Sequence, residues 1–135
     1  MSDVRRWLEH TGEVELEIES DSERGVFAEA LAGLSELMGE PANDDVVRSA
    51  HRVVVNAADR ASLLVAWLEE LLWIAERDGI VPERIVTLEL DDDELRAEVL
   101  ARPGPPRPLV KAVTWHDLCF EPGDEGFHAR VVLDV

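Results

Sequence analysis

Residues 14–19 alternate strictly between apolar and acidic side chains, as Val14-Glu15-Leu16-Glu17-Ile18-Glu19. Successive side chains of a β-strand point to opposite faces, so a period of two predicts a strand with one buried and one solvated face. A strand of this kind is stable only in a sheet whose apolar face is covered by another layer. The chain therefore must contain a sheet with a core on one side and a charged surface on the other.

Two segments have the apolar spacing of amphipathic helices. The first follows a start signal in which Ser20 and Glu23 have capping-box spacing, and it ends at Gly39. The second begins after Asp59 as the predicted N-cap and ends at Gly79. Its wide apolar stripe consists of Leu63, Leu64, Trp67, Leu68, Leu71, Leu72, Ile74 and Ala75. We expect both helices to cover the sheet.

Strands account for most of the remaining chain. The β-branched run at residues 53–55 predicts a central strand. Later strands are predicted at residues 85–90, 95–99, 109–120 and 127–135, separated by turns and by a proline-rich loop. The order β-α-β-α-β-β-β-β predicts an α+β fold, a two-layer sandwich with two helices packed on a mainly antiparallel or mixed sheet.

Acidic residues greatly outnumber basic ones. Among 135 residues there are 30 Asp and Glu against 13 Lys and Arg, which is a formal charge of −17. A surface with this charge repels phosphate backbones and anionic membranes, so we expect no direct nucleic-acid binding and no membrane association. Cations and basic protein surfaces are the favoured partners.

Length and cysteine content indicate one ordinary domain, residues 1–135, with 46% hydrophobic residues. The single cysteine excludes an intrachain disulfide and a four-cysteine zinc site. No apolar run approaches the roughly 18 residues of a membrane span, and the polar start does not resemble a signal peptide. We therefore expect a cytoplasmic protein.

Carboxylates occur at two places that are able to carry chemistry. One is the entry to the first predicted strand, with the residues Glu9-His10-Thr11-Gly12-Glu13. Two interpretations are open for it: a site for metal binding or proton transfer, or simply a polar start to the strand. At the other end of the chain, Leu133-Asp134-Val135 places the terminal carboxylate beside the Asp134 side chain. Such oxygen donors suit hard cations, including Ca²⁺ and Mg²⁺. The residues alone do not pair these two positions.

Other charged or nucleophilic residues are less informative. Lys111 is the only lysine, and it holds an ion pair, meets a partner or has a purely structural role. The acidic run at residues 91–94 is interpreted as a hairpin turn, because a calcium loop needs alternate ligands over about twelve residues. Cys119 and His116 are three residues apart, so a strand turns them to opposite faces and no Cys–His nucleophile is expected.

Four segments together resemble the archease family. They are Leu8-Glu9-His10-Thr11-Gly12-Glu13, Trp67-Leu68-Glu69-Glu70-Leu71-Leu72, Val110-Lys111-Ala112-Val113-Thr114-Trp115-His116 and Leu133-Asp134-Val135. The segments span nearly the entire chain and keep the order of the family's motifs.

The resemblance implies a small accessory protein that is not an enzyme. Its partner would be the GTP-dependent RNA ligase of tRNA splicing, whose guanylylation and multiple turnover archeases promote. The resemblance also implies a divalent cation, Ca²⁺ in the first place and Mg²⁺ or Mn²⁺ as alternatives, held by Glu13, Asp134 and the carboxylate of Val135. Lys111 is implied as a further residue of partner activation.

Four polar residues are expected around these ligands, namely Glu9, His10, His116 and Asp117. Two other functions remain open. The resemblance also fits a chaperone-like modulator of another RNA-modifying enzyme, such as a tRNA methyltransferase. The carboxylates themselves fit a metal-dependent hydrolase, which requires an open coordination position and a walled cavity.

One departure concerns the cation site directly. Gly12-Glu13 stands where the family motif has Ala-Asp, so the carboxylate is kept but lies one methylene further from the backbone. Ca²⁺ tolerates variable coordination geometry whereas Mg²⁺ requires a strict one, so the longer side chain is easier to reconcile with Ca²⁺ than with Mg²⁺. Gly12 adds backbone freedom next to it.

Overall fold

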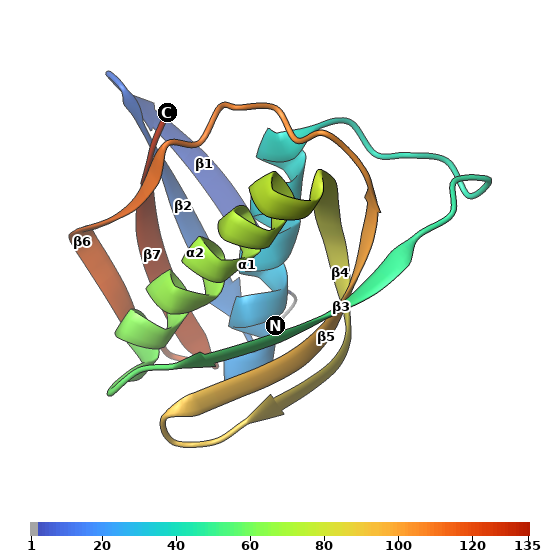
Figure 1. The fold of residues 1–135 in the computed structure, drawn as a ribbon. Coiled ribbons are helices and arrows are strands. Elements are labelled where there is room, and N and C mark those ends of the chain that lie inside the picture. Colours follow the sequence, from blue (N-terminus) through green and yellow to red (C-terminus); the bar gives the residue numbers. More distant parts are fainter. Residues whose placement is uncertain (1–2) are drawn as a thin grey trace.

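The computed structural model describes residues 3–135, so the first two residues of the predicted domain lie outside the described residues (Figure 1). The described chain forms seven strands and two helices. In order they are β1 (Val4–His10), β2 (Glu13–Ser20), α1 (Glu23–Met38), β3 (Ser49–Asn56), α2 (Arg60–Asp78), β4 (Ile80–Leu90), β5 (Glu94–Pro103), β6 (Ala112–Pro122) and β7 (Phe127–Asp134).

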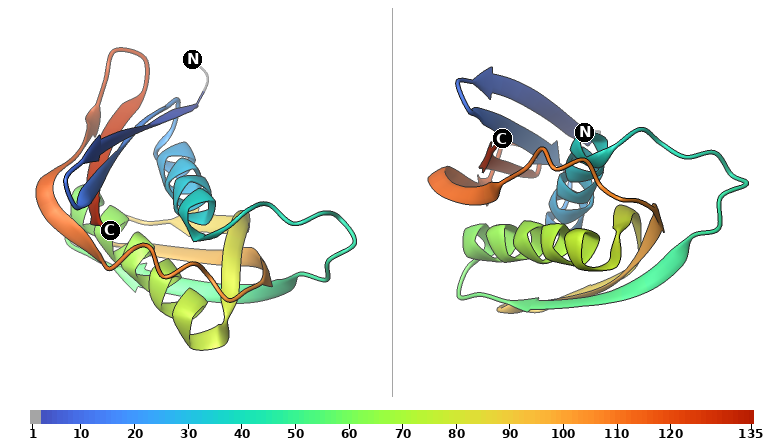
Figure 2. Two further views of the ribbon diagram at one scale, coloured as in Figure 1. Left: turned by 90° about the horizontal axis from the view of Figure 1, so that it is seen from above. Right: turned by 45° about the horizontal axis from the view of Figure 1, so that its top comes forward.

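These strands form two antiparallel sheets, with the orders β1-β2-β7-β6 and β3-β5-β4. Both helices contact both sheets: α1 packs on β2 and β4, and α2 packs on β6 and β3 (Figure 2). Their apolar side chains and the inner faces of the sheets form one continuous core. Neither described helix is long and apolar enough to cross a membrane.

The predicted α+β class, with two helices on antiparallel sheets, is confirmed. The structure adds β1, which the predicted order lacks because its side chains are mostly exposed and do not alternate regularly between apolar and polar. The strands also divide into two sheets, so each helix packs against both of them. The hydrophobic pattern of each strand records burial but does not record which sheet the strand joins.

The start of α1 differs from the prediction. Ser22 is the N-cap, and its Oγ accepts a hydrogen bond from the backbone N–H of Gly25 at 3.0 Å. The predicted cap, Ser20, is fully buried at the end of β2 and donates to Asp3 Oδ1 at 2.7 Å. The capping box of Ser20 and Glu23 is therefore wrong, whereas the predicted helix end at Gly39 is confirmed.

α2 forms as predicted. Asp59 Oδ1 accepts the backbone N–H of Ser62 at 2.8 Å, and this bond lowers the pKa of the Asp59 carboxyl. Gly79 ends the helix with φ at 65°, and its N–H donates to the carbonyl of Ala75. The predicted stripe is buried, with Leu72 only partly so.

The predicted central strand at residues 53–55 is wrong. It belongs to β3, an edge strand of the three-stranded sheet. Val53 and Val55 point into the core, whereas Val54 is 48% exposed. β-Branched residues fit edge and central strands alike, so the run alone did not discriminate between them.

The C-terminal strands follow the prediction with shifted bounds. The predicted strand at residues 109–120 begins only at Ala112, so Lys111 precedes it. Pairing of β6 with β7 is interrupted between Thr114 and Cys119. The turn at residues 91–94 is confirmed, because the N–H of Asp91 donates to the carbonyl of Glu94 at 2.9 Å.

Candidate functional site

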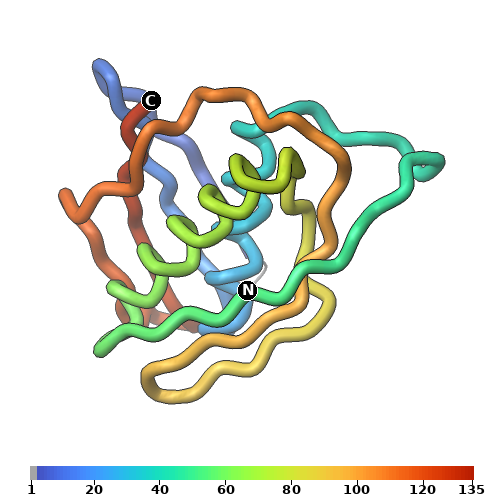
Figure 3. Tube along the Cα trace, in the orientation of Figure 1, coloured from blue at the N-terminus to red at the C-terminus, as the bar shows by residue number. Residues whose placement is uncertain are grey.

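The chain end lies beside the β1–β2 turn, as Figure 3 shows. In the ladder of β2 and β7, Glu13 is directly opposite Asp134. The N–H of Val135 donates to the Gly12 carbonyl at 3.1 Å, and the N–H of Lys111 donates to the Asp134 carbonyl at 2.8 Å. Segments from the start and end of the chain are thus held together by backbone hydrogen bonds.

Four side chains form a row across this end of the sheet. His10, Glu13, Asp134 and Ala112 occupy opposed positions on β1, β2, β7 and β6. Opposed residues of an antiparallel ladder share a face, with Cβ atoms about 5 Å apart. Because Leu16 and Leu133 are fully buried on the helix side, this row lies on the outer face. Glu9, one residue from His10, faces the other way.

The donor set suits a hard cation. Glu13 and Asp134 are partly exposed carboxylates at opposed positions. Like charges that face each other directly across two strands repel. The carboxylate of Val135 follows directly after Asp134. Ca²⁺ is bound by several carboxylate oxygens in flexible geometry, so these groups fit such an ion.

Gly12 forms the turn that sets this register. Its φ is 73°, a left-handed value, and a Cβ built there meets no atom within 4 Å. Gly12→Ala therefore introduces backbone strain but no steric clash. We expect it to lower the free energy of unfolding by about 1 kcal/mol. Urea denaturation measures the effect. Gly12→Asn should cost less, because asparagine tolerates this conformation, and equal stability of the wild type and Gly12→Ala would contradict the prediction.

Lys111 lines a groove between α2 and the start of β6. The other lining residues include Glu69, Trp73 and Glu76 of α2, and the groove holds about 240 Å³. Lys111 and Trp73 are both exposed. The Lys111 backbone is thus joined to Asp134 of the carboxylate row, whereas its side chain lies on the α2 side of the sheet. The depression there also offers an aromatic ring and acidic side chains.

His116 and Asp117 lie elsewhere on β6. They pair with each other at 3.2 Å in the interrupted part of the ladder, where Asp117 has a φ of 54°. Four and five residues of strand separate them from Ala112, a span of about 13–17 Å. The structure thus brings Glu13, Asp134, Val135, Lys111 and His10 to one end of the sheet, and places His116 and Asp117 further along.

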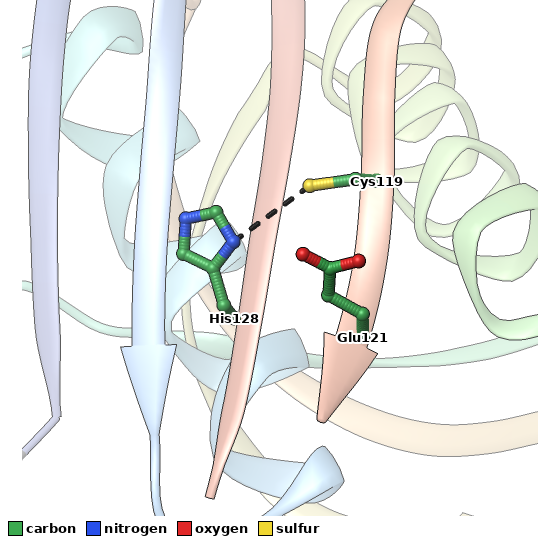
Figure 4. A group of neighbouring side chains, drawn as sticks. All are labelled: Cys119, Glu121 and His128. Carbon is green, nitrogen blue, oxygen red and sulfur yellow. Dashed lines mark hydrogen bonds between the residues drawn. The ribbon is translucent and has the colours of Figure 1, made fainter. Parts of the chain in front are cut away.

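A second group of side chains was missed by the sequence analysis. Cys119 and Glu121 of β6 and His128 of β7 point to the same side of the sheet (Figure 4). Cys119 Sγ lies 3.8 Å from His128 Nδ1. Pairing residues outward from the turn at residues 123–126 would have revealed the group, because it places Glu121 opposite His128.

Fold and site together define a small α+β protein that gathers carboxylates from distant parts of its chain at one end of a four-stranded sheet. The model of the archease protein family matches residues 6–135, and the chain belongs to this family.

Relatives cover almost the same length. The protein archease of Methanosarcina acetivorans is 28% identical over 141 residues, covering 96% of this chain and 94% of the relative. The protein archease of Methanothermobacter thermautotrophicus is 32% identical over 117 residues, covering 82% of this chain and 83% of the relative.

Solved structures agree with the fold. The solution structure of Methanobacterium thermoautotrophicum protein 1598 has a TM-score of 0.73 at 28% identity and covers 97% of this chain and 98% of its own. The crystal structure of an archease, described as a possible chaperone, from Thermotoga maritima has a TM-score of 0.70. At 20% identity over 100% of both chains, it shows the fold alone.

Proposed function

We propose that this chain is a non-catalytic accessory protein that promotes guanylylation and multiple turnover of a GTP-dependent RNA ligase in tRNA splicing. Membership of the archease family supports an accessory role. The observation that carries the proposal is the register that sets Glu13 opposite Asp134, next to the chain end and Lys111.

Each residue has a defined part in this proposal. Glu13, Asp134 and the carboxylate of Val135 hold a divalent cation, Ca²⁺ in the first place. When bound, the cation supplies positive charge and open coordination positions for oxygen ligands of the partner. The Lys111 backbone is hydrogen-bonded to Asp134, and its side chain offers a second positive charge from the groove on the α2 side of the sheet. His10 of β1 is itself part of the row, whereas Glu9 beside it faces the other side of the sheet.

Net charge supports docking to a protein rather than to RNA. At −17 the chain repels phosphate backbones, so RNA handling falls to the ligase. A basic enzyme surface is attracted over the range of a Debye length, about 8–10 Å, and its encounter with this chain is accelerated. Docking should therefore weaken as the salt concentration rises.

The test is ligase guanylylation with and without this protein, at varied Ca²⁺ and Mg²⁺. We expect the Glu13→Gln, Asp134→Asn double variant to reduce stimulation at least about tenfold, which is ~1.4 kcal/mol of activation free energy. The variant keeps side-chain volume and removes two charges. Glu17→Gln, on the same face of β2 but paired with Arg6 at 3.5 Å, is the matched control and should stimulate normally.

Several outcomes would contradict this function. Full stimulation by the double variant would remove the carboxylates from the mechanism. Phosphoester turnover by the chain alone, lost in the double variant, would favour the metal-dependent hydrolase. Stimulation of a tRNA methyltransferase in place of the ligase would favour the chaperone-like modulator.

A further inference from the structure

We propose that Cys119, Glu121 and His128 form a binding site for a borderline-soft divalent metal, Zn²⁺ in the first place. One ligand atom from each residue lies within 4.8 Å of the others. Two of the residues are two positions apart on β6, and the third is opposite one of them on β7. A rigid hairpin thus presents sulfur, nitrogen and oxygen donors on one face, as Figure 4 shows.

The distances match zinc coordination. Zn–S and Zn–N bonds are about 2.3 and 2.0–2.1 Å, so a tetrahedral angle between them separates sulfur and nitrogen by about 3.6 Å. The observed separation of Cys119 Sγ and His128 Nδ1 is 3.8 Å. A small rotation of either side chain closes this difference. The Glu121 carboxylate is exposed and can turn toward the same point.

The surroundings of these three side chains favour a cation that keeps one coordination position open. Glu19 of β2 is opposite His128 on its other side and adds negative charge. A cavity of about 140 Å³ beside the group is lined by Glu19, His128 and the β6–β7 turn. Three protein ligands with solvent access to a fourth position are the arrangement of zinc sites that bind water or a further ligand.

Metal binding at Cys119 must displace the thiol proton, because the thiolate is the form that ligates a metal. Burial raises the pKa of its thiol, although the charge and backbone N–H of Arg130 act in the opposite direction. Binding of Zn²⁺ therefore replaces the thiol proton with a Zn–S bond and releases H⁺ to solvent. Without metal, the thiol is a weak partner for His128.

This site is separate from the carboxylates at the chain end. His128 and Asp134 are six residues apart on β7, which is about 20 Å. The donors also differ, because the chain end offers only oxygen whereas this group offers sulfur and nitrogen. Hard Ca²⁺ and Mg²⁺ prefer the first set, and Zn²⁺ prefers the second.

Cobalt provides the spectroscopic test, since Co²⁺ substitutes for Zn²⁺ and reports a bound thiolate by a sulfur-to-cobalt charge-transfer band. We expect the 135-residue chain to show this band at one Co²⁺ per chain and to lose it when Zn²⁺ is added. Equilibrium dialysis with Zn²⁺ should show at least about 100-fold weaker binding for Cys119→Ser and for His128→Gln, because removal of a residue that only supports a ligand already costs about 10–100-fold. His51→Gln, in β3 of the other sheet, is the control and should bind normally.

Two results would overturn the proposal. One is the absence of one-to-one binding at micromolar Zn²⁺ in a chain whose circular dichroism shows it to be folded. The other is Zn²⁺ binding that survives both Cys119→Ser and His128→Gln but is lost in the Glu13→Gln, Asp134→Asn variant. That result would assign the metal to the chain end.

Discussion

Trp67→Ala should lower the free energy of unfolding by about 4 kcal/mol, the typical cost of emptying a fully buried tryptophan site. Trp67 of α2 is completely buried and belongs to the hydrophobic core. Its Nε1–H donates to the Phe27 carbonyl of α1 at 3.0 Å. The substitution therefore opens a cavity at the centre of the core and removes a bond that joins the two helices. Chemical denaturation followed by circular dichroism measures the loss.

Trp73→Ala is the matched control for this prediction. Trp73 is on the same helix but is 53% exposed, and its ring lies 4.3 Å from the Arg77 guanidinium. Its removal should cost less than about 1 kcal/mol, since only a surface cation–π contact is lost. Trp67→Phe should fall between the two, because most of the volume remains and the N–H is lost. Equal losses from both alanine variants would show that Trp67 is not the central packing residue.

Glu83→Gln should destabilise the fold by about 2–3 kcal/mol at pH 7. Arg102 is only 5% exposed, and its Nη1 donates to Glu83 Oε2 at 3.3 Å. The substitution removes the negative charge but keeps an amide oxygen that is able to accept a hydrogen bond. The buried Arg102 is then left with neutral acceptors, including the hydroxyl of Ser35 and the carbonyl of Gly39. Breaking a buried pair costs about 3–5 kcal/mol, and the lower figure follows from the partial water access of Glu83.

Acid should remove this difference. Burial opposes ionisation of Glu83, but the hydrogen bonds and charges of Arg48 and Arg102 outweigh it and lower the pKa below the ordinary 4.5. A lowered folded-state pKa stabilises the protein above the unfolded-state pKa, and that stabilisation is lost as pH falls through the folded value. In urea titrations the difference between wild type and variant should therefore begin to shrink as the pH falls below about 4.5, and it should vanish below the lower folded-state pKa.

Glu89→Gln, on the same strand, tests whether the effect is specific. The Glu89 side chain is 76% exposed and lies 4.0 Å from Arg96, so its loss should change stability by less than about 0.5 kcal/mol at any pH. A persistent difference between wild type and Glu83→Gln at low pH would indicate that packing, rather than the ion pair, is responsible.

Local patterns predicted most of the elements. Alternation at residues 14–19 identified β2, and Asp59 and Gly79 identified both ends of α2, because caps and strand faces depend on neighbouring residues alone. The predictions failed where a residue's conformation depended on tertiary contacts rather than on its neighbours in the sequence. Ser20 has a good capping side chain, but its burial against Asp3 overrode that preference.

The candidate sites depended on pairing between strands. Glu13 and Asp134 were linked only through the family resemblance, because no local pattern connects residues so far apart in sequence. Cys119 was compared with His116 on its own strand, while the nearer histidine was His128 on the next strand. Both examples show that a register between strands brings donors together.

The amino-acid sequence was enough to predict the α+β class, the two helices, the acidic surface and a resemblance to a recognisable family. These follow from composition, periodicity and local capping, which act over a few residues. The division of the strands into two sheets and the edge position of β3 became apparent only in three dimensions. The same holds for the pairing of Glu13 with Asp134 and for the approach of Cys119 to His128. Strand pairing is a long-range choice, settled by the packing of the whole core around α1 and α2.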